Sequence, residues 1–347
     1  MTYHERPGVY SAYDTEAVYA SGTGRRVIAL VGVSAAETGL YSFSSWPEAR
    51  TVMGESCQLG KMLKLAYQNG AQTVLACPAA EDSLSAYTAA VALALAEKKA
   101  AFLALGSQRQ DVLTMAAGKL IAAAGERNEC IGIASLSGKT DSEAADLAEA
   151  VNSERMILLG TGVTEDGLTE AASGLAAAAL AGVLSDQSDP AAPLHGAVLE
   201  GLCGVESIYT DAGIDTLVQS GVSVLEAVSG AVTVVRAVTT RTSTLNVPDA
   251  SWREVTTMLI LDDVIPSVRR SLKAKFLRCK NTSVTRNAIR SQVIVELQDR
   301  VDRQIIESFE GLRVQPLISD PSVCEVSFTF AVVHGLSRIL LTAHVQI

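Results

Sequence analysis

Residues 101–136, AFLALGSQRQDVLTMAAGKLIAAAGERNECIGIASL, contain one complete strand–helix–strand unit. The apolar runs at 101–106 and 130–136 have the length of strands, and the segment at about 109–124 has helical length and spacing. Because both apolar runs are continuous rather than alternating, each strand is expected to be buried on both faces, as in a parallel sheet covered by helices. This unit indicates an α/β fold.

The same alternation extends to both sides of this unit. Further apolar runs of strand length occupy residues 26–34, 73–77 and 156–160. Segments with helical spacing lie at about 59–70, 83–98, 141–151 and 168–184. Strands joined by single helices form a parallel sheet with helices on both faces. We therefore predict a mainly parallel, doubly wound α/β domain over residues 26–240.

The stretch VSGAVTVVRAVTTRT (228–242) closes this domain. It is predicted to end one strand, turn at a Ser-Gly pair and form a second strand that carries Arg236, with Arg241 shortly after it. A surface loop rich in Ser, Asp and Pro at 185–196 and a short helix at 213–221 precede this hairpin.

The last part of the chain changes to long helices followed by strands. Residues 249–277 contain an amphipathic helix with Pro266 near its start, and a second helix is predicted at about 284–309. Strands are predicted at 326–330 and 341–347, because apolar and polar residues alternate there. A strand that ends the chain presents unpaired backbone groups unless another strand pairs with it. We predict an α+β domain over 241–347 whose terminal strand pairs with another molecule.

The charge of the chain is unevenly distributed. The net charge is −10, but residues 1–240 hold 14 basic and 27 acidic residues, whereas residues 241–347 hold 14 basic and 11 acidic ones. This sign difference suits an assembly in which one face meets an acidic partner. A basic run over residues 269–280 is interpreted either as a solvated face or as a contact with an acidic protein. Nucleic acid is not expected as a partner, because Phe276 is the only aromatic residue among these charges.

Composition also excludes several classes of protein. The six cysteines are scattered without a C-x-x-C pair and the four histidines lie far apart, so we expect neither a disulfide framework nor a metal site. No apolar run reaches the roughly 18 to 20 residues of a membrane span, so no membrane insertion is expected. The N-terminus lacks the pattern of a signal peptide, which predicts a protein made and kept in the cytoplasm.

Three short motifs are candidates for chemistry. The loop GIASLSGKT (132–140) resembles a phosphate-binding loop but has five residues between its glycines instead of four, so we favour a turn in which Thr140 and Glu143 form a capping box. The glycines of 159–167 are also wrongly spaced for a dinucleotide. Asp262-Asp263 is interpreted as capping a helix start. We therefore predict no catalytic residue and no cofactor, with a nucleotide-binding α/β enzyme that uses the 132–140 loop as the alternative.

Four segments, taken in order, resemble one family. They are ERPGVYSAYD (5–14), GIDTLVQSGVSVLEAVSGAVTVVRAVTTRT (213–242), SWREVTTMLILDDVIPSVRRSL (251–272) and LLTAHVQI (340–347). In this combination they resemble the contractile tail sheath proteins of bacteriophages and of phage-tail-like bacteriocins. The middle of the chain matches only in its α/β character.

The resemblance implies a structural polymer and not an enzyme. Subunits would form six-membered rings stacked helically around an inner tube, and the stack would shorten to drive the tube through a target cell envelope. The implied partners are further copies of the chain, the inner tail tube protein, and baseplate and tail terminator proteins. Assembly is implied in the cytoplasm of a bacterial host, before the subunit becomes part of a virion tail or a released particle. A phage, a bacteriocin, another contractile injection device and a scaffold of closed rings remain open.

The resemblance also assigns domains and contact residues. Residues 26–240 would be the outer domain, and the inner domain would combine a linking arm at 1–25 with residues 241–347. Arg236 and Arg241 would make structural or intersubunit contacts. The strand-exchanging arms would include Pro7, Gly8, Val9, Tyr10, Leu341, Ala343, Val345 and Ile347. The candidates for facing an acidic tube are Arg269, Arg270, Lys273 and Lys275.

Overall fold

The structure is a computed structural model that describes residues 26–160, 162–164 and 172–336. The linking arms predicted from the sequence lie outside these residues. They comprise Pro7, Gly8, Val9, Tyr10, Leu341, Ala343, Val345 and Ile347.

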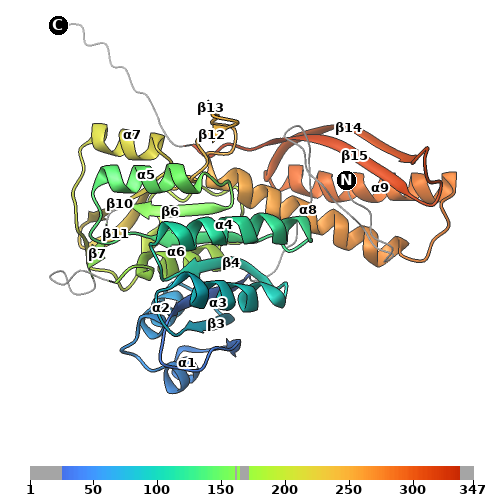
Figure 1. Ribbon diagram of the computed structural model, residues 1–347. Coiled ribbons are helices and arrows are strands. Elements are labelled where there is room, and N and C mark those ends of the chain that lie inside the picture. Colours follow the sequence, from blue (N-terminus) through green and yellow to red (C-terminus); the bar gives the residue numbers. More distant parts are fainter. Residues whose placement is uncertain (1–25, 161, 165–171, 337–347) are drawn as a thin grey trace, which may run out of the picture.

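A nine-stranded sheet forms the body of the molecule (Figure 1), in the order β2-β3-β1-β4-β5-β6-β10-β11-β8. Its strands are β1 (Val27–Val33), β2 (Tyr41–Phe43), β3 (Val74–Ala79), β4 (Ala100–Leu105), β5 (Ile131–Ser135), β6 (Met156–Gly160), β8 (Val198–Leu199), β10 (Ser223–Val228) and β11 (Ala231–Arg236). All neighbours from β3 through β10 are parallel, and only β2, β11 and β8 pair antiparallel at the two edges. The predicted mainly parallel sheet is confirmed.

Helices cover both faces of this sheet, as the continuous apolar strand runs require. One face packs against α1 (Trp46–Met53), α2 (Gln58–Gln68), α6 (Leu175–Asp186) and the first half of α8 (Val255–Phe276). The other face packs against α3 (Leu84–Ala96), α4 (Gln110–Gly125), α5 (Asp141–Val151) and α7 (Asp211–Gln219). Side chains alternate between the two layers even within one strand, since Ile28 and Leu30 join the first core and Ala29 and Val31 the second.

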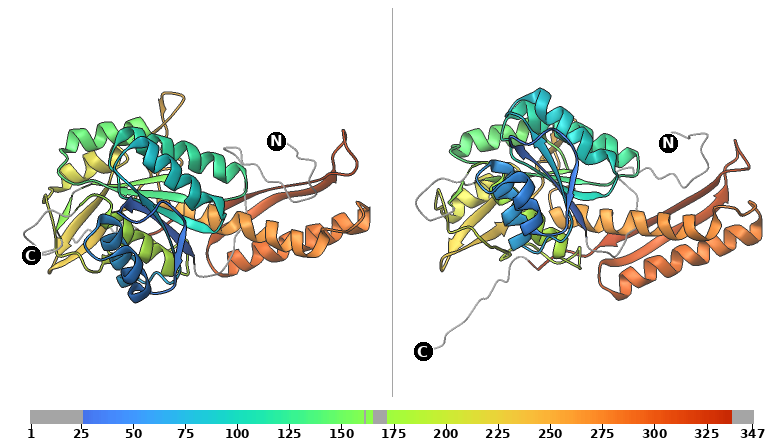
Figure 2. Two further views of the ribbon diagram at one scale, coloured as in Figure 1. Left: turned by 60° about the horizontal axis from the view of Figure 1, so that its bottom comes forward. Right: turned by 90° about the horizontal axis from the view of Figure 1, so that it is seen from below.

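An elongated arm extends from the body, to the right in Figure 1 and in both views of Figure 2. It consists of α8, α9 (Ser283–Asp302) and the hairpin of β14 (Ile306–Pro316) and β15 (Cys324–Val332). The arm has a core of its own, in which α8 supplies Val264, Val268 and Leu272. Because α8 also places Val255 and Leu259 in the core of the body, this one helix joins body and arm. The predicted domain boundaries at 25/26 and 240/241 stay a prediction.

The second arm helix is shorter than the sequence predicts. The stripe of apolar residues continues to Ile305, but α9 ends at Asp302 instead of 309. Gln304 has a left-handed backbone (φ 59°), and the amide of Ile305 donates to the carbonyl of Arg300 at 2.9 Å. This pattern ends a helix, and glycine usually provides it. The predicted end of the helix was wrong because glutamine has no preference for a left-handed backbone, so the sequence does not indicate this turn.

The interpretation of Pro266 and of Asp262-Asp263 is also wrong. Since α8 begins at Val255, Pro266 lies inside the helix rather than near its start, and the two carboxylates lie mid-helix and cannot cap it. Proline has no N–H to donate to the carbonyl four residues earlier, which costs one helical hydrogen bond. The carboxylates are instead bound by arginines from distant segments, as described below.

Candidate functional site

Two buried ion pairs fix α8 to the body. Arg155, directly before β6, is fully buried and donates two hydrogen bonds to Asp262 of α8, at 2.8 and 3.0 Å. Further along the helix Arg269 donates to Glu129, which precedes β5, at 2.7 Å. Burial raises the pKa of the Asp262 carboxyl, and the Arg155 charge opposes that rise. The helix is therefore held across the amino ends of two adjacent strands.

A third buried pair joins the two arm helices. Arg300 of α9 and Asp263 of α8 are both almost fully buried, with 3.8 Å between guanidinium nitrogen and carboxylate oxygen. Arg300 also donates to the hydroxyl of Ser267 at 2.8 Å. Because such groups are destabilising when unpaired, these contacts define one arrangement of α8 against its neighbours.

The four candidate tube-facing residues have different environments on α8. Arg269 is 12% exposed and pairs with Glu129 within the same chain. Arg270, Lys273 and Lys275 are exposed on the half of α8 that belongs to the arm. Lys275 donates a hydrogen bond to Gln292 of α9. Of the four candidates, Arg270, Lys273 and Lys275 are therefore free of a buried ion pair and belong to the exposed basic surface of the arm.

The two arginines of the predicted hairpin are bound within the chain. Arg236, at the end of β11, pairs with Glu254 just before α8. Arg241 donates to Glu154 at 2.7 Å, and Glu154 is next to Arg155 in the sequence. Both side chains thus hold the segment that leads from the sheet into α8.

The hairpin of β14 and β15 is the broadest unpaired backbone surface of the arm. Within the described parts of the chain, β14 and β15 pair only with each other, so each strand has a free outer edge. In β15 the inward positions, among them Val326, Phe328 and Phe330, are only half-buried, and Ser327 and Thr329 between them are exposed. A two-stranded sheet is marginally stable alone, so this hairpin depends on its packing against the arm helices. The strand predicted at 326–330 lies within β15, but β14 was not predicted, and its first residues fall in the helix predicted at about 284–309.

The usual ligand crevice of a doubly wound sheet is filled here by a side chain. Such sheets bind ligands beyond the carboxyl ends of the strands where the strand order reverses, which is between β1 and β4. At this point the Gln58 amide oxygen accepts from the amide of Val33 at 2.9 Å, and its nitrogen donates to the carbonyls of Gly106 and Ser173 at 2.6 and 2.8 Å. The crevice is thus closed by protein atoms.

The loop at 132–140 binds a carboxylate of the same chain. The hydroxyl of Ser137 and the amide of Gly138 each donate to the Glu206 carboxylate, at 3.0 Å. The predicted capping box is confirmed, because Thr140 and Glu143 bond each other reciprocally at the start of α5. Glu206 occupies the donors that a phosphate would need, which argues against the nucleotide-binding alternative.

Other kinds of site find no support in the described residues. No group of three or more potential metal ligands occurs among residues 26–160, 162–164 and 172–336. In the same parts of the chain, no helix combines the length and apolarity that a membrane crossing requires.

The described residues thus form an α/β body with a filled ligand crevice, joined by buried ion pairs to an arm whose β14–β15 hairpin has unpaired edges. The chain belongs to the phage tail sheath family. The model of the phage tail sheath protein central domain matches residues 80–240, and that of the phage tail sheath C-terminal domain matches residues 247–346. Membership confirms the resemblance found in the sequence and supports a structural rather than an enzymatic role.

Solved structures show the same fold. The helical sheath of the anti-feeding prophage in its contracted state has a TM-score of 0.73 at 17% identity, with 99% of each chain covered. The contracted PVC sheath complex, from an extracellular contractile injection system, has a TM-score of 0.72 at 14% identity and covers 100% of this chain and 99% of that one. The sheath tail protein from Desulfitobacterium hafniense has a TM-score of 0.68 at 15% identity and covers 94% and 100%. Among curated proteins no match was found.

Proposed function

We propose that this chain is the subunit of a contractile tail sheath that polymerises as stacked six-membered rings around an inner tube. Shortening of the stack drives the tube through a target cell envelope. Membership of the sheath family and the shared fold with two contracted sheaths support this proposal. The body at 26–240 forms the outer domain. Residues 241–347, together with the linking segment at 1–25, form the inner domain. Baseplate and tail terminator proteins bind the ends of the stack, which assembles in the bacterial host cytoplasm.

The unpaired hairpin of the arm is the observation that carries the proposal. Free edges on β14 and β15 accept strands from neighbouring subunits. These strands are supplied by the linking segments at 1–25 and 340–347. In the linking segment at 340–347, apolar residues alternate with polar ones; the apolar residues are Leu341, Ala343, Val345 and Ile347. An added strand with this alternation sets its apolar side chains over α8 and α9, beside the half-buried side chains of β15.

Strand addition is strong enough to hold a mesh together. If about six backbone hydrogen bonds form and each contributes about 1 kcal/mol net, one added strand supplies several kcal/mol before the cost of ordering it. Shortening needs no chemical step, because a difference in contacts between two states of the polymer, with the long state kinetically trapped, provides the free energy.

Electron microscopy of the purified chain tests this proposal. Without a tube, the chain is expected to form long hollow cylinders in negative stain, because the strand-exchange contacts lie within the sheath itself. Monomers at all concentrations, or single closed rings that never stack, would contradict a contractile sheath.

The exposed cations of the arm provide the contact with an acidic tube. Reversing two of them, Lys273→Glu with Lys275→Glu, is expected to abolish co-assembly on the tube while cylinders without tube still form, because like charges then meet across the contact. Co-sedimentation with the tube protein measures the first result and electron microscopy the second. The matched control is Lys98→Glu with Lys99→Glu, which makes the same charge change on the body. Unaltered co-assembly of the arm variant would remove Lys273 and Lys275 from the contact.

A further inference from the structure

A small hairpin with an apolar tip projects from the body near the base of the arm, at the top of Figure 1. It consists of β12 (Ser243–Thr244) and β13 (Val247–Pro248), joined by Leu245 and Asn246. Both turn residues have left-handed backbones, with φ of 50° and 63°. Leu245 is 94% exposed and Val247 is 63% exposed.

Leucine is an unfavourable choice at this position in the isolated subunit. A two-residue turn with positive φ at both residues favours Asn-Gly or Gly-Gly, because a side chain on a left-handed backbone is strained. The leucine also gains nothing from burial within its own chain, since nearly all of it faces solvent. A position that combines strain with an exposed apolar side chain is typical of a contact made by another molecule.

The base of the hairpin is held rigidly by polar contacts. The Asn152 side chain accepts from the amides of Thr242 and Ser243 at 3.0 and 3.3 Å and donates to the Ser243 carbonyl at 3.1 Å. Thr244 donates to Asp249 at 2.6 Å and accepts from Arg241. The hydrogen bonds that the Asp249 carboxylate accepts from Thr244 and Ser251 lower its pKa to about 2. The tip is therefore preorganised for binding.

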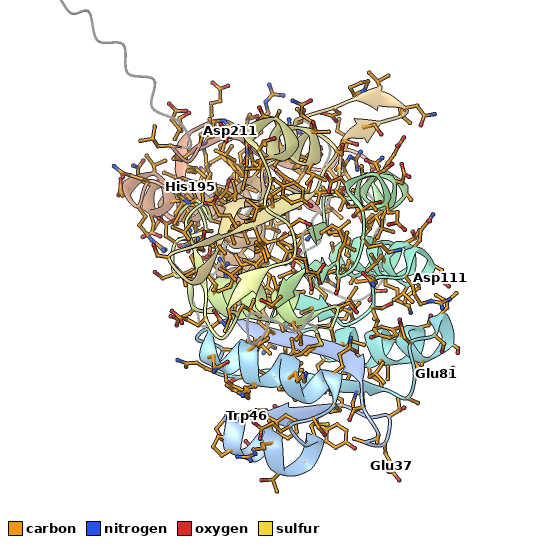
Figure 3. All side chains as sticks on the ribbon, turned by 90° about the vertical axis from the view of Figure 1, so that its left-hand side faces the viewer. Glu37, Trp46, Glu81, Asp111, His195 and Asp211 are labelled. Atoms are coloured by element: carbon orange, nitrogen blue, oxygen red, sulfur yellow. The ribbon has the colours of Figure 1, made fainter. Side chains whose placement is uncertain are left out.

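The same chain carries a cavity of about 300 Å³ between α7 and the start of α8. Its lining combines apolar side chains, among them Leu194, Ile214, Val218 and Val255, with the Arg236–Glu254 ion pair. Asp215, His195 and His334 contribute to its rim and are exposed. In Figure 3, His195 lies at the upper left of the body and the small hairpin projects at its upper right. A tip and a cavity at different places on one subunit allow head-to-tail contacts, which generate rings or helices.

We propose that Leu245, supported by Val247, inserts into this cavity of a neighbouring copy of the chain. The occupant is a second copy because Leu245 is 94% exposed and so does not fill the cavity of its own chain, and because repetition of a contact between two different patches links each copy to the next. This inference rests on the proposed function and adds to it a contact made by the body. That contact is separate from the strand exchange by the linking segments at 1–25 and 340–347.

A glycine at the tip tests the contact. Leu245→Gly suits a left-handed turn, so the isolated variant is expected to melt at the same temperature as the unaltered chain or higher. Because full burial of a leucine side chain changes an equilibrium constant by roughly tenfold or more, the concentration needed for cylinder formation is expected to rise by about that factor. Ile208→Ser is the control, since Ile208 is an apolar residue that is 95% exposed elsewhere on the body. Cylinders that form at an unchanged concentration would overturn the proposal.

Cross-linking identifies the cavity as the partner. Leu245→Cys is combined with His195→Cys in a chain whose exposed cysteines carry Cys203→Ser and Cys279→Ser, and the cylinders are treated with diamide, which accepts the two electrons and two protons of each new disulfide. A ladder of disulfide-linked oligomers is expected. Leu245→Cys with His195 unchanged is expected to give none. Absence of the ladder from the double variant, or a disulfide confined to single chains, would overturn the assignment. If the unaltered chain forms no cylinders, the sheath proposal fails by itself, and cross-linking of the double variant in concentrated solution still decides between contact and no contact.

Discussion

Replacing Arg155 by methionine is expected to lower the free energy of unfolding by about 3–5 kcal/mol, which is the usual cost of removing one partner of a buried ion pair. The guanidinium of Arg155 is fully buried, and it donates one hydrogen bond to each carboxylate oxygen of Asp262. Methionine fills the space but leaves the carboxylate without its opposite charge. The same pair holds α8 to the body, so its loss weakens the joint between body and arm.

The destabilisation by Arg155→Met is expected to depend on pH. Burial raises the pKa of Asp262 and the Arg155 charge opposes this rise, so the folded variant has a still higher pKa at this carboxyl. A raised pKa in the folded state means that the folded state binds the proton more tightly than the unfolded one. The unfolded states of the two chains bind this proton equally, so the variant loses least relative to the unaltered chain at low pH. Its deficit grows as the pH rises above the folded-state pKa of Asp262 in the unaltered chain, which burial also raises.

Urea unfolding followed by circular dichroism at pH 5 and pH 7 measures both effects. The control is Arg109→Met, which removes an exposed ion pair with Asp111 and is expected to leave the midpoint unchanged. Arg155→Met combined with Asp262→Leu is expected to recover a large part of the loss, since no unpaired charge then remains. If the single variant is as stable as the unaltered chain at pH 7, Asp262 does not depend on Arg155.

Removing residues 340–347 is expected to abolish ordered cylinders while the isolated subunit still folds. Within the described residues, α8, α9, β14 and β15 already share a buried core, so these elements are expected to pack without this segment. The polymer, in contrast, loses a strand worth several kcal/mol at every subunit, if each of about six backbone hydrogen bonds contributes about 1 kcal/mol. Electron microscopy and circular dichroism of the truncated chain measure assembly and folding separately.

Two single substitutions one residue apart provide a matched pair for this truncation. Val345→Asp places a charge on the apolar side of the predicted strand, and Gln346→Asp places it on the polar side. Because side chains of a strand alternate, only the first is expected to prevent assembly. Equal effects of the two substitutions would mean that residues 340–347 do not add to a sheet as a strand.

The body of this fold is encoded locally, which is why the sequence predicts it. Strands such as β4 and β5 are buried on both faces, so each appears as a continuous apolar run, and helices such as α4 separate them with their own spacing. The capping box of Thr140 and Glu143 was predicted for the same reason, because both partners lie within four residues.

What the sequence did not reveal depends on segments that are far apart in the chain. Asp262 was assigned to a helix start because its partner Arg155 lies 107 residues away. Gln58 closes the ligand crevice through backbone groups of Val33 in β1 and Gly106 just after β4, and Glu206 occupies the 132–140 loop from a distance of 68 residues. Neither side chain has a local pattern that would indicate its role. The left-handed backbone of Gln304, which follows α9, could not be predicted either, because helices usually end with glycine in this conformation.

The central claim, that the hairpin of the arm is completed by strands from other copies, can be tested most directly by hydrogen–deuterium exchange. Amides on the outer edges of β14 and β15 would be followed in cylinders, in the dispersed chain and in the chain without residues 340–347. Strand addition predicts that these edge amides exchange rapidly in both dispersed samples and become protected in cylinders, with alternate residues protected along each edge. Equally fast exchange in cylinders and in the dispersed chain would contradict it.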